Sequence, residues 1–136
     1  MTINWEKSEL SFEMLTELKT RKPPIYNLFV YGTLKHSYIL ESVLERKYEG
    51  DFKDAVLPGF IRLQPSFYMI FEDEGSQVEG KLVSGITASD LKKLDRYEGV
   101  ASKFYRRKSV TAKVNGENVK TWVYHNGPSF KKEDYM

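Results

Sequence analysis

The chain has 136 residues, of which 40% are hydrophobic and 29% charged, which suits one globular domain with a single core. Its 21 basic and 19 acidic residues leave a net charge of +2, too balanced to indicate nucleic acid as a partner. Cysteine is absent, which excludes disulfides, thiolate catalysis and cysteine metal sites, and no apolar run approaches the roughly 20 residues that span a bilayer.

Four apolar residues recur at helical spacing near the N-terminus: Leu10, Met14, Leu15 and Leu18. They predict an amphipathic helix over residues 8–20, which Pro23 and Pro24 end. We expect residues 1–24 to be an appendage that packs on the domain or on a partner, including a second copy of the chain. The first residues lack the apolar core of a signal peptide, so a cytoplasmic location is expected.

The most informative segment is an apolar run that ends at Tyr31-Gly32 and continues with Thr33 and Leu34. A run rich in aromatic and β-branched residues predicts a buried strand, here over residues 26–31. The glycine lets the backbone turn sharply and leaves room for a ligand to approach main-chain N–H groups. Consecutive N–H groups in such a turn can cradle an anion such as a carboxylate.

Several short elements follow in the middle of the chain. A short helix is expected around three apolar residues, Leu40, Val43 and Leu44. Strands are expected at residues 52–56, 60–63, 66–71 and 78–83. Pro58-Gly59 predicts a turn between the first two of these strands, and the polar residues 72–76 are expected to end the third.

A helix is expected to begin after Thr87, because Asp90 supplies the acidic partner of an N-cap. The pattern carries this helix to about Tyr97. The six or seven short strands and this one internal helix, placed after the fifth strand, predict a mostly antiparallel sheet that is curved or closed into a small β-barrel. The amphipathic N-terminal helix is an extra element outside that sheet.

The dipeptide Asn115-Gly116 predicts a tight hairpin turn between strands at residues 108–114 and 118–125. The last ten residues follow no clear pattern. The expected organisation therefore has three parts: an appendage of residues 1–24, a domain of residues 25–126 and a tail of residues 127–136.

A basic and aromatic run precedes the hairpin: Lys103, Phe104, Tyr105, Arg106, Arg107 and Lys108. Such a mixture can bind single-stranded nucleic acid. The start of a strand with one solvated face explains the same residues, and we favour that interpretation.

The predicted helix places a carboxylate on its inward face. Leu91 and Leu94 define that face, and Glu98 falls between them at roughly 100° per residue. Loss of water there should raise its pKa toward the range that suits a general acid–base. The alternative is that Gly99 caps the helix and Glu98 faces solvent in a frayed last turn. Asp95 also lies near the inward face, where we expect a structural role through bonds to backbone N–H groups of a neighbouring loop.

Short motifs follow one another along the chain: Phe29-Val30-Tyr31-Gly32-Thr33-Leu34, then Val78-Glu79-Gly80, then Leu94-Asp95 with Glu98-Gly99, then Tyr105, Arg107 and Val110, and last Trp122-Val123-Tyr124. Over residues 26–125 their order and spacing resemble the γ-glutamylcyclotransferase-like family. The short Tyr-Gly-Thr-Leu form resembles its γ-glutamylamine cyclotransferase, or AIG2-like, branch.

The resemblance implies a small α+β domain built on a β-barrel. It implies intramolecular aminolysis of a γ-glutamyl amide, which gives 5-oxoproline and a free amine or amino acid. Glu98 corresponds to the family's catalytic glutamate, and Tyr31, Gly32, Thr33 and Leu34 correspond to its substrate-cradling loop. Neither a cofactor nor a metal is implied.

The roles of Tyr105 and of the two histidines are less specific. Tyr105 either lends a hydroxyl to the pocket or is a tyrosine of the barrel core. His36 and His125 stand alone in the sequence, without the clustering that metal ligands require. The family often has a glycine where this chain has His36 and Ser37, so the loop that enters the next helix is expected to differ. The expected partner is a small γ-glutamyl substrate, with no nucleic acid or membrane.

Three functions compete at this point. The first is a cyclotransferase that uses Glu98 as acid–base, with a γ-glutamylamine as the first substrate choice and a γ-glutamyl amino acid as the second. The second is a non-catalytic binding module of the same fold that senses or sequesters a small anionic metabolite. The third is an interaction protein that uses the basic strand and the N-terminal helix. The presence of Glu98 favours the enzyme.

Overall fold

The computed structural model describes residues 23–63 and 69–136. The helix predicted over residues 8–20, and with it the expected oligomer contact, lies outside the described residues. The same holds for residues 64–68, which include the start of the strand predicted at residues 66–71.

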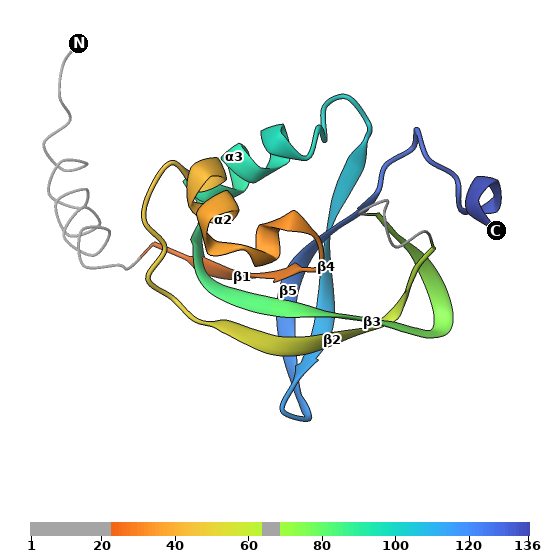
Figure 1. Cartoon of the computed structure of the whole chain (residues 1–136), viewed down its shortest axis with the longest axis horizontal. Coiled ribbons are helices and arrows are strands. Elements are labelled where there is room, and N and C mark those ends of the chain that lie inside the picture. Colours follow the sequence, from red (N-terminus) through yellow and green to blue (C-terminus); the bar gives the residue numbers. More distant parts are fainter. Residues whose placement is uncertain (1–22, 64–68) are drawn as a thin grey trace, which may run out of the picture.

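The described residues form five strands, namely β1 (Ile25–Val30), β2 (Phe52–Arg62), β3 (Ile70–Thr87), β4 (Tyr105–Val114) and β5 (Glu117–Asn126). They also form the helices α2 (Ser37–Leu44) and α3 (Ala88–Tyr97) and the short 3-10 turns η1 (Thr33–Lys35) and η2 (Lys132–Tyr135). The strands pair in a closed barrel of order β1-β3-β2-β4-β5, in which only β1 and β5 are parallel. Figure 1 shows both α-helices on the same side of the sheet. The predicted α+β class is confirmed.

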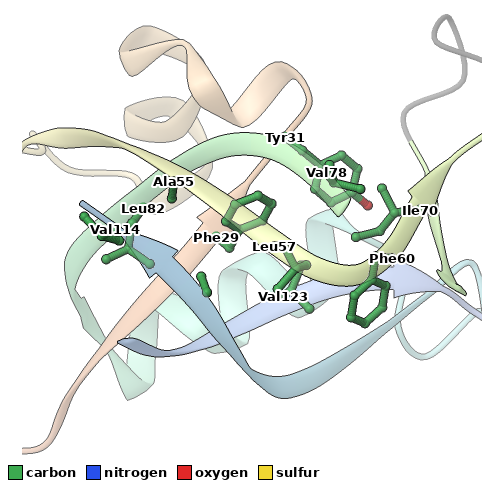
Figure 2. Packing of buried hydrophobic residues seen from close by; sticks show 11 residues of the cluster. Phe29, Tyr31, Ala55, Leu57, Phe60, Ile70, Val78, Leu82, Val114 and Val123 are labelled. Carbon is green, nitrogen blue, oxygen red and sulfur yellow. The ribbon is translucent and has the colours of Figure 1, made fainter. Parts of the chain in front are cut away.

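Strand β1 separates two apolar clusters. Phe29 points into the barrel, where it packs with residues from each of the other strands (Figure 2). Leu28 and Val30 point the other way and pack with leucines of α2 and α3. Successive side chains of a strand alternate between its faces, so a continuous apolar run is what burial on both faces requires. The prediction of a buried strand in this segment is confirmed.

The predicted number of strands is wrong, because Pro58-Gly59 does not separate two strands. It lies inside β2, where the register with β3 shifts between Pro58 and Phe60. Gly59 adopts φ +84°, so the strand absorbs the pair as a local irregularity and continues. Two predicted strands are therefore one.

The prediction that residues 72–76 end a strand is also wrong, because β3 continues through them beside β2. Phe60 pairs with Glu72 and Pro58 pairs with Gln77, so the polar residues 73–76 form an outward irregularity of β3 rather than its end. Gly75 adopts φ +87° within it. Strand β3 thus covers 18 residues, and α3 follows the third strand and not the fifth.

Helix α3 begins as the sequence predicts. The Thr87 side chain accepts a hydrogen bond from the Asp90 N–H, and the Asp90 carboxylate accepts one from the Thr87 N–H, which completes a capping box. Asp90 is buried and also receives two bonds from Arg46, which follows α2. Lys93 donates to the Leu44 carbonyl oxygen at 2.9 Å. These contacts fix α3 to α2.

The hairpin between β4 and β5 is also as predicted, with Asn115 and Gly116 at φ +52° and +78°. The last ten residues contain η2 and pack on the barrel through aromatic contacts, Phe104 with Phe130 and Phe71 with Tyr135. Within the described ranges, no helix is long and apolar enough to cross a membrane.

Gly80 lies where β3 passes β1 at close range. A Cβ atom there would stand 2.4 Å from the Val30 carbonyl oxygen and 2.7 Å from Cζ of Phe29. The change Gly80→Ala should lower the free energy of unfolding by about 1–3 kcal/mol, because the backbone of β1 must move. Urea unfolding measures this. Glu79→Ala, at an exposed neighbouring position, is the control and should stay within about 0.5 kcal/mol of wild type. Equal stability of the two variants would contradict this packing.

Candidate functional site

A cavity of about 450 Å³ opens where β1 ends. Its lining comes from four places in the sequence: the end of β1 with the turn that follows, the end of α3, the start of β4 and the end of β5. The lining residues are Phe29, Val30, Tyr31, Gly32, Thr33, Leu34, Tyr97, Glu98, Tyr105 and Tyr124. All six of the residues predicted for the site lie in this one cavity, although Glu98 and Tyr105 are far from the others in sequence.

The turn after β1 is held from both sides. The buried Tyr31 hydroxyl donates to the Tyr124 carbonyl oxygen at 2.6 Å, and Arg62 Nη1 donates to the Tyr31 carbonyl oxygen at 3.2 Å. The Lys35 N–H closes the 3-10 turn onto the Gly32 carbonyl oxygen at 3.1 Å. The first N–H groups of such a turn have no partner within it. Gly32, Thr33 and Leu34 of this turn line the cavity, so their main-chain N–H groups are the candidate donors for a ligand there.

Glu98 lies at the C-terminal end of α3 and faces this cavity. Its N–H still bonds to the Leu94 carbonyl oxygen at 2.8 Å, and Gly99 then leaves the helix at φ +66°. Burial raises the pKa of the Glu98 carboxyl to about 7. Glu98 thus lines the cavity, which agrees with the inward position expected from the helical spacing, and Gly99 ends the helix as the alternative also expected.

Tyrosines surround this carboxyl. Burial, together with the charge of Glu98, raises the pKa of Tyr105 to about 12 and that of Tyr31 well above its ordinary range. The pKa of Tyr124 is raised as well, first by burial and then by its bond to Asp95. All three therefore stay protonated at neutral pH. The cavity wall presents neutral phenols to Glu98.

Asp95 joins α3 to the strands beneath it. It accepts the Tyr124 hydroxyl at 2.6 Å and takes Arg107 in a two-pronged contact, Nε at 2.8 Å and Nη2 at 3.1 Å. Burial opposes its charge, but the bonds from Arg107 and Tyr124 outweigh burial and hold the pKa of Asp95 below its ordinary value. A structural role is thus present, although its partners are side chains rather than the backbone of a loop.

Four lining residues were not predicted for the site, namely Phe29, Val30, Tyr97 and Tyr124, and the last two carry hydroxyl groups. Tyr97 is half exposed at the rim, where its hydroxyl lies 3.4 Å from Thr33 Oγ1. Tyr124 reaches the cavity because β5 pairs with both β1 and β4. Signals for both were present: Tyr97 adjoins Glu98, and Tyr124 belongs to the motif of the last strand.

The two histidines lie away from the cavity wall. His125 is buried, with its ring against Phe60 and its Nδ1 3.1 Å from Asn126 Oδ1. Burial is the main reason why the pKa of His125 is lowered. In the part of the chain that the structure describes, no three His, Asp or Glu side chains are placed to hold a metal ion.

A closed five-stranded barrel that brings a glycine turn against a glutamate at the end of a helix defines the class of this protein. Residues 28–136 match the family described as "Gamma-glutamyl cyclotransferase, AIG2-like". The chain therefore belongs to the gamma-glutamyl cyclotransferase, AIG2-like family.

Individual relatives agree with this assignment. AIG2-like protein C of Arabidopsis thaliana is 37% identical over 108 residues, which cover 74% of this chain and 60% of that protein. The chain thus spans about three fifths of that relative's length. A solution structure from Arabidopsis thaliana has a TM-score of 0.69 at 27% identity and covers 86% of this chain and 71% of its own. A structure named gamma-glutamyl cyclotransferase has a TM-score of 0.62 at 20% identity, covers 76% of this chain and 67% of its own, and shows the shared fold.

The raised pKa of Glu98 makes a prediction about stability. Between the ordinary value of 4.5 and about 7, the folded chain keeps a proton that the unfolded chain releases. The stabilising contribution is complete below about pH 4.5 and is lost as pH rises through 7. The free energy of unfolding should fall by about 3 kcal/mol over this range. Gln does not titrate, so this pH dependence should be absent in Glu98→Gln. Urea unfolding should therefore show wild type losing about that much stability relative to Glu98→Gln between pH 4.5 and 8. A difference that does not change with pH would contradict the burial of Glu98.

Proposed function

We propose that this protein is a γ-glutamyl amide cyclotransferase. It carries out intramolecular aminolysis of its substrate and releases 5-oxoproline and an amine, with Glu98 as general acid–base. One observation carries the proposal: the Glu98 carboxyl, with a pKa of about 7, lines the same cavity as Gly32 and Thr33 of the turn after β1. Family membership supports the reaction class.

The reaction needs a proton carrier rather than a covalent nucleophile. The α-ammonium of the substrate first gives a proton to the Glu98 carboxylate, and the freed amine attacks the γ-carbonyl carbon. The new C–N bond closes the ring and leaves a second proton to be lost from the ring nitrogen. The old C–N bond breaks as Glu98 returns the first proton to the departing nitrogen, and the second proton passes to the same amine, which leaves as an ammonium while Glu98 is again a carboxylate. A carboxyl whose pKa lies near neutrality performs both transfers without a large driving-force penalty in either direction.

The glycine turn is proposed to hold the substrate. Main-chain N–H groups around Gly32 and Thr33 can bind the α-carboxylate, the oxyanion that develops at the γ-carbonyl, or both. Because both reacting groups belong to one molecule, holding it in a folded shape can supply up to about 7–11 kcal/mol of rate advantage. Tyr105 lines the same cavity and is protonated at neutral pH, so it is proposed as a further donor to the substrate.

The substrate we propose first is a γ-glutamylamine. The leaving group then carries no carboxylate, which fits a cavity whose lining, over the described residues, holds one carboxyl, Glu98, and no Lys, Arg or His side chain. A γ-glutamyl amino acid would bring a second carboxylate to this wall, so it stands second.

Replacement of Glu98 tests the acid–base role. Glu98→Gln keeps the shape of the side chain but cannot accept a proton, so release of 5-oxoproline should fall about 10²–10⁴-fold. The assay is 5-oxoproline release from a panel of γ-glutamylamines and γ-glutamyl amino acids.

Glu79→Gln, at an exposed position of β3, is the matched control and should keep full activity. Wild-type activity in Glu98→Gln would remove Glu98 from the mechanism. Binding of panel members by wild type with no release from any of them would indicate the binding module instead.

Replacement of Gly32 tests the cradle. Gly32→Val places a branched side chain where the ligand approaches the backbone, so affinity should fall at least about tenfold. Calorimetry in a Glu98→Gln background, with a γ-glutamylamine as ligand, measures binding without turnover. Lys35→Ala, an exposed residue of the same turn, is the control and should bind as the background does. Equal affinity of both variants would show that the turn does not approach the ligand.

A further inference from the structure

The end of α3 carries two carboxylates on one face. Asp95 precedes Glu98 by three residues, a spacing that places both side chains on the same side of a helix. Only Asp95 has a cationic partner there. Arg107 binds it with two hydrogen bonds, whereas no hydrogen bond or ion pair reaches the Glu98 carboxylate from residues 23–63 or 69–136.

Arg107 is fixed in place from several directions. It is the cross-strand neighbour of Tyr124, which donates to the same Asp95 carboxylate. Its guanidinium also lies 4.3 Å from the ring centre of Trp122, a cation–π contact. The Arg107 and Asp95 side chains are 24% and 29% exposed, so water screens the pair only in part.

Arg107 is also close to the cavity in the fold. It follows Tyr105 by two residues on β4, and alternate residues of a strand share a face. Tyr105 lines the cavity. The Arg107 guanidinium therefore lies on the same face of β4 as Tyr105, and it is paired there with the Asp95 carboxylate.

The groups that face Glu98 come from each element packed around it. They are Tyr31, which directly follows β1, Tyr97 of its own helix, Tyr105 of β4 and Tyr124 of β5. Arg62 of β2 donates to the Tyr31 carbonyl oxygen. Burial raises the pKa of Tyr31, Tyr105 and Tyr124, so these three phenols are uncharged at neutral pH. Arg107 is the cation that Asp95 binds on this side of α3, so its release would leave an unpaired positive charge on the face of β4 that carries Tyr105.

We propose that Asp95 is a positioning residue that sequesters the Arg107 cation, so that Glu98 stays without a counter-ion and remains able to exchange a proton. The catalytic consequence rests on the proposed function, but the effect on Glu98 itself does not. An opposite charge within about 4–6 Å lowers the pKa of a carboxyl by about 1–3. When Asp95 loses its charge, Arg107 loses its partner, and Glu98 is the carboxylate left on that helix face.

The test is a set of charge variants in which the Glu98 carboxyl is titrated directly. The probe is the carbon-13 carboxyl signal of Glu98, assigned by its disappearance in Glu98→Gln, in protein without substrate. Asp95→Asn should lower the pKa of Glu98 by about one pH unit or more. Asp95→Asn with Arg107→Gln should return it to the wild-type value, because neither charge is then present.

A second variant should shift the pKa of Glu98 in the opposite direction, which a general loss of structure would not explain. Arg107→Gln alone leaves the Asp95 charge unpaired beside Glu98, so it should raise the pKa of Glu98. Arg46→Gln is the matched control: it removes an ion pair at the other end of α3 and should leave the titration of Glu98 unchanged. Asp95→Glu, which keeps the charge, should stay near wild type.

The proposal is overturned if Asp95→Asn leaves the pKa of Glu98 unchanged, or if the double variant fails to restore it. If Asp95→Asn does not fold, an unchanged or lowered value in Arg107→Gln overturns it equally. None of these titrations needs turnover, so their outcome is independent of whether the protein releases 5-oxoproline. If the protein releases 5-oxoproline, the acidic limb of its pH–rate profile should move to lower pH in Asp95→Asn.

Discussion

The site depends on one constraint: the Glu98 carboxyl is largely buried at the end of α3, and within residues 23–63 and 69–136 no cation pairs with it. Burial disfavours its ionised form and moves its pKa from 4.5 to about 7. The position is costly to the fold, and other contacts of the helix offset that cost. At one end, the capping box and Arg46 hold Asp90, and near the other, Arg107 and Tyr124 hold Asp95. A strained or destabilising group at a site, supported by well-satisfied neighbours, is the pattern expected of function.

The barrel explains how distant segments meet at this carboxyl. Strand β1 is buried on both faces, so its end and the turn after it have a fixed position in the fold. Strand β5 pairs in parallel with β1 and antiparallel with β4, which brings Tyr124 and Tyr105 to the same cavity. The Tyr31 hydroxyl bonded to the Tyr124 carbonyl oxygen ties the turn to β5. The cavity is therefore a product of strand order, not of one local motif.

Local signals in the sequence were sufficient where the structure is local. The Asn115-Gly116 hairpin and the capping box at Thr87 follow from a few adjacent residues. The inward direction of Glu98 follows from helical spacing relative to Leu91 and Leu94. In each case neighbouring residues decide the outcome.

The sequence was insufficient where pairing with a distant strand decides. Pro58-Gly59 is typical of a turn, but β2 pairs with the long strand β3 on both sides of it and therefore continues. The polar residues 73–76 read as a loop for the same reason. The side-chain partners of Asp95 were also missed, because Arg107 and Tyr124 become neighbours only when β4 and β5 pair. Such contacts depend on register, which single-sequence patterns do not contain.

A direct titration of the Glu98 carboxyl in the wild-type protein tests the central claim. Carbon-13 spectra recorded from pH 4 to 9 without substrate follow this one group. The account predicts a pKa of about 7, since the carboxyl is buried among neutral tyrosines. A value at or below 4.5 would mean that water or a cation reaches Glu98, and would contradict both the burial and the acid–base role built on it.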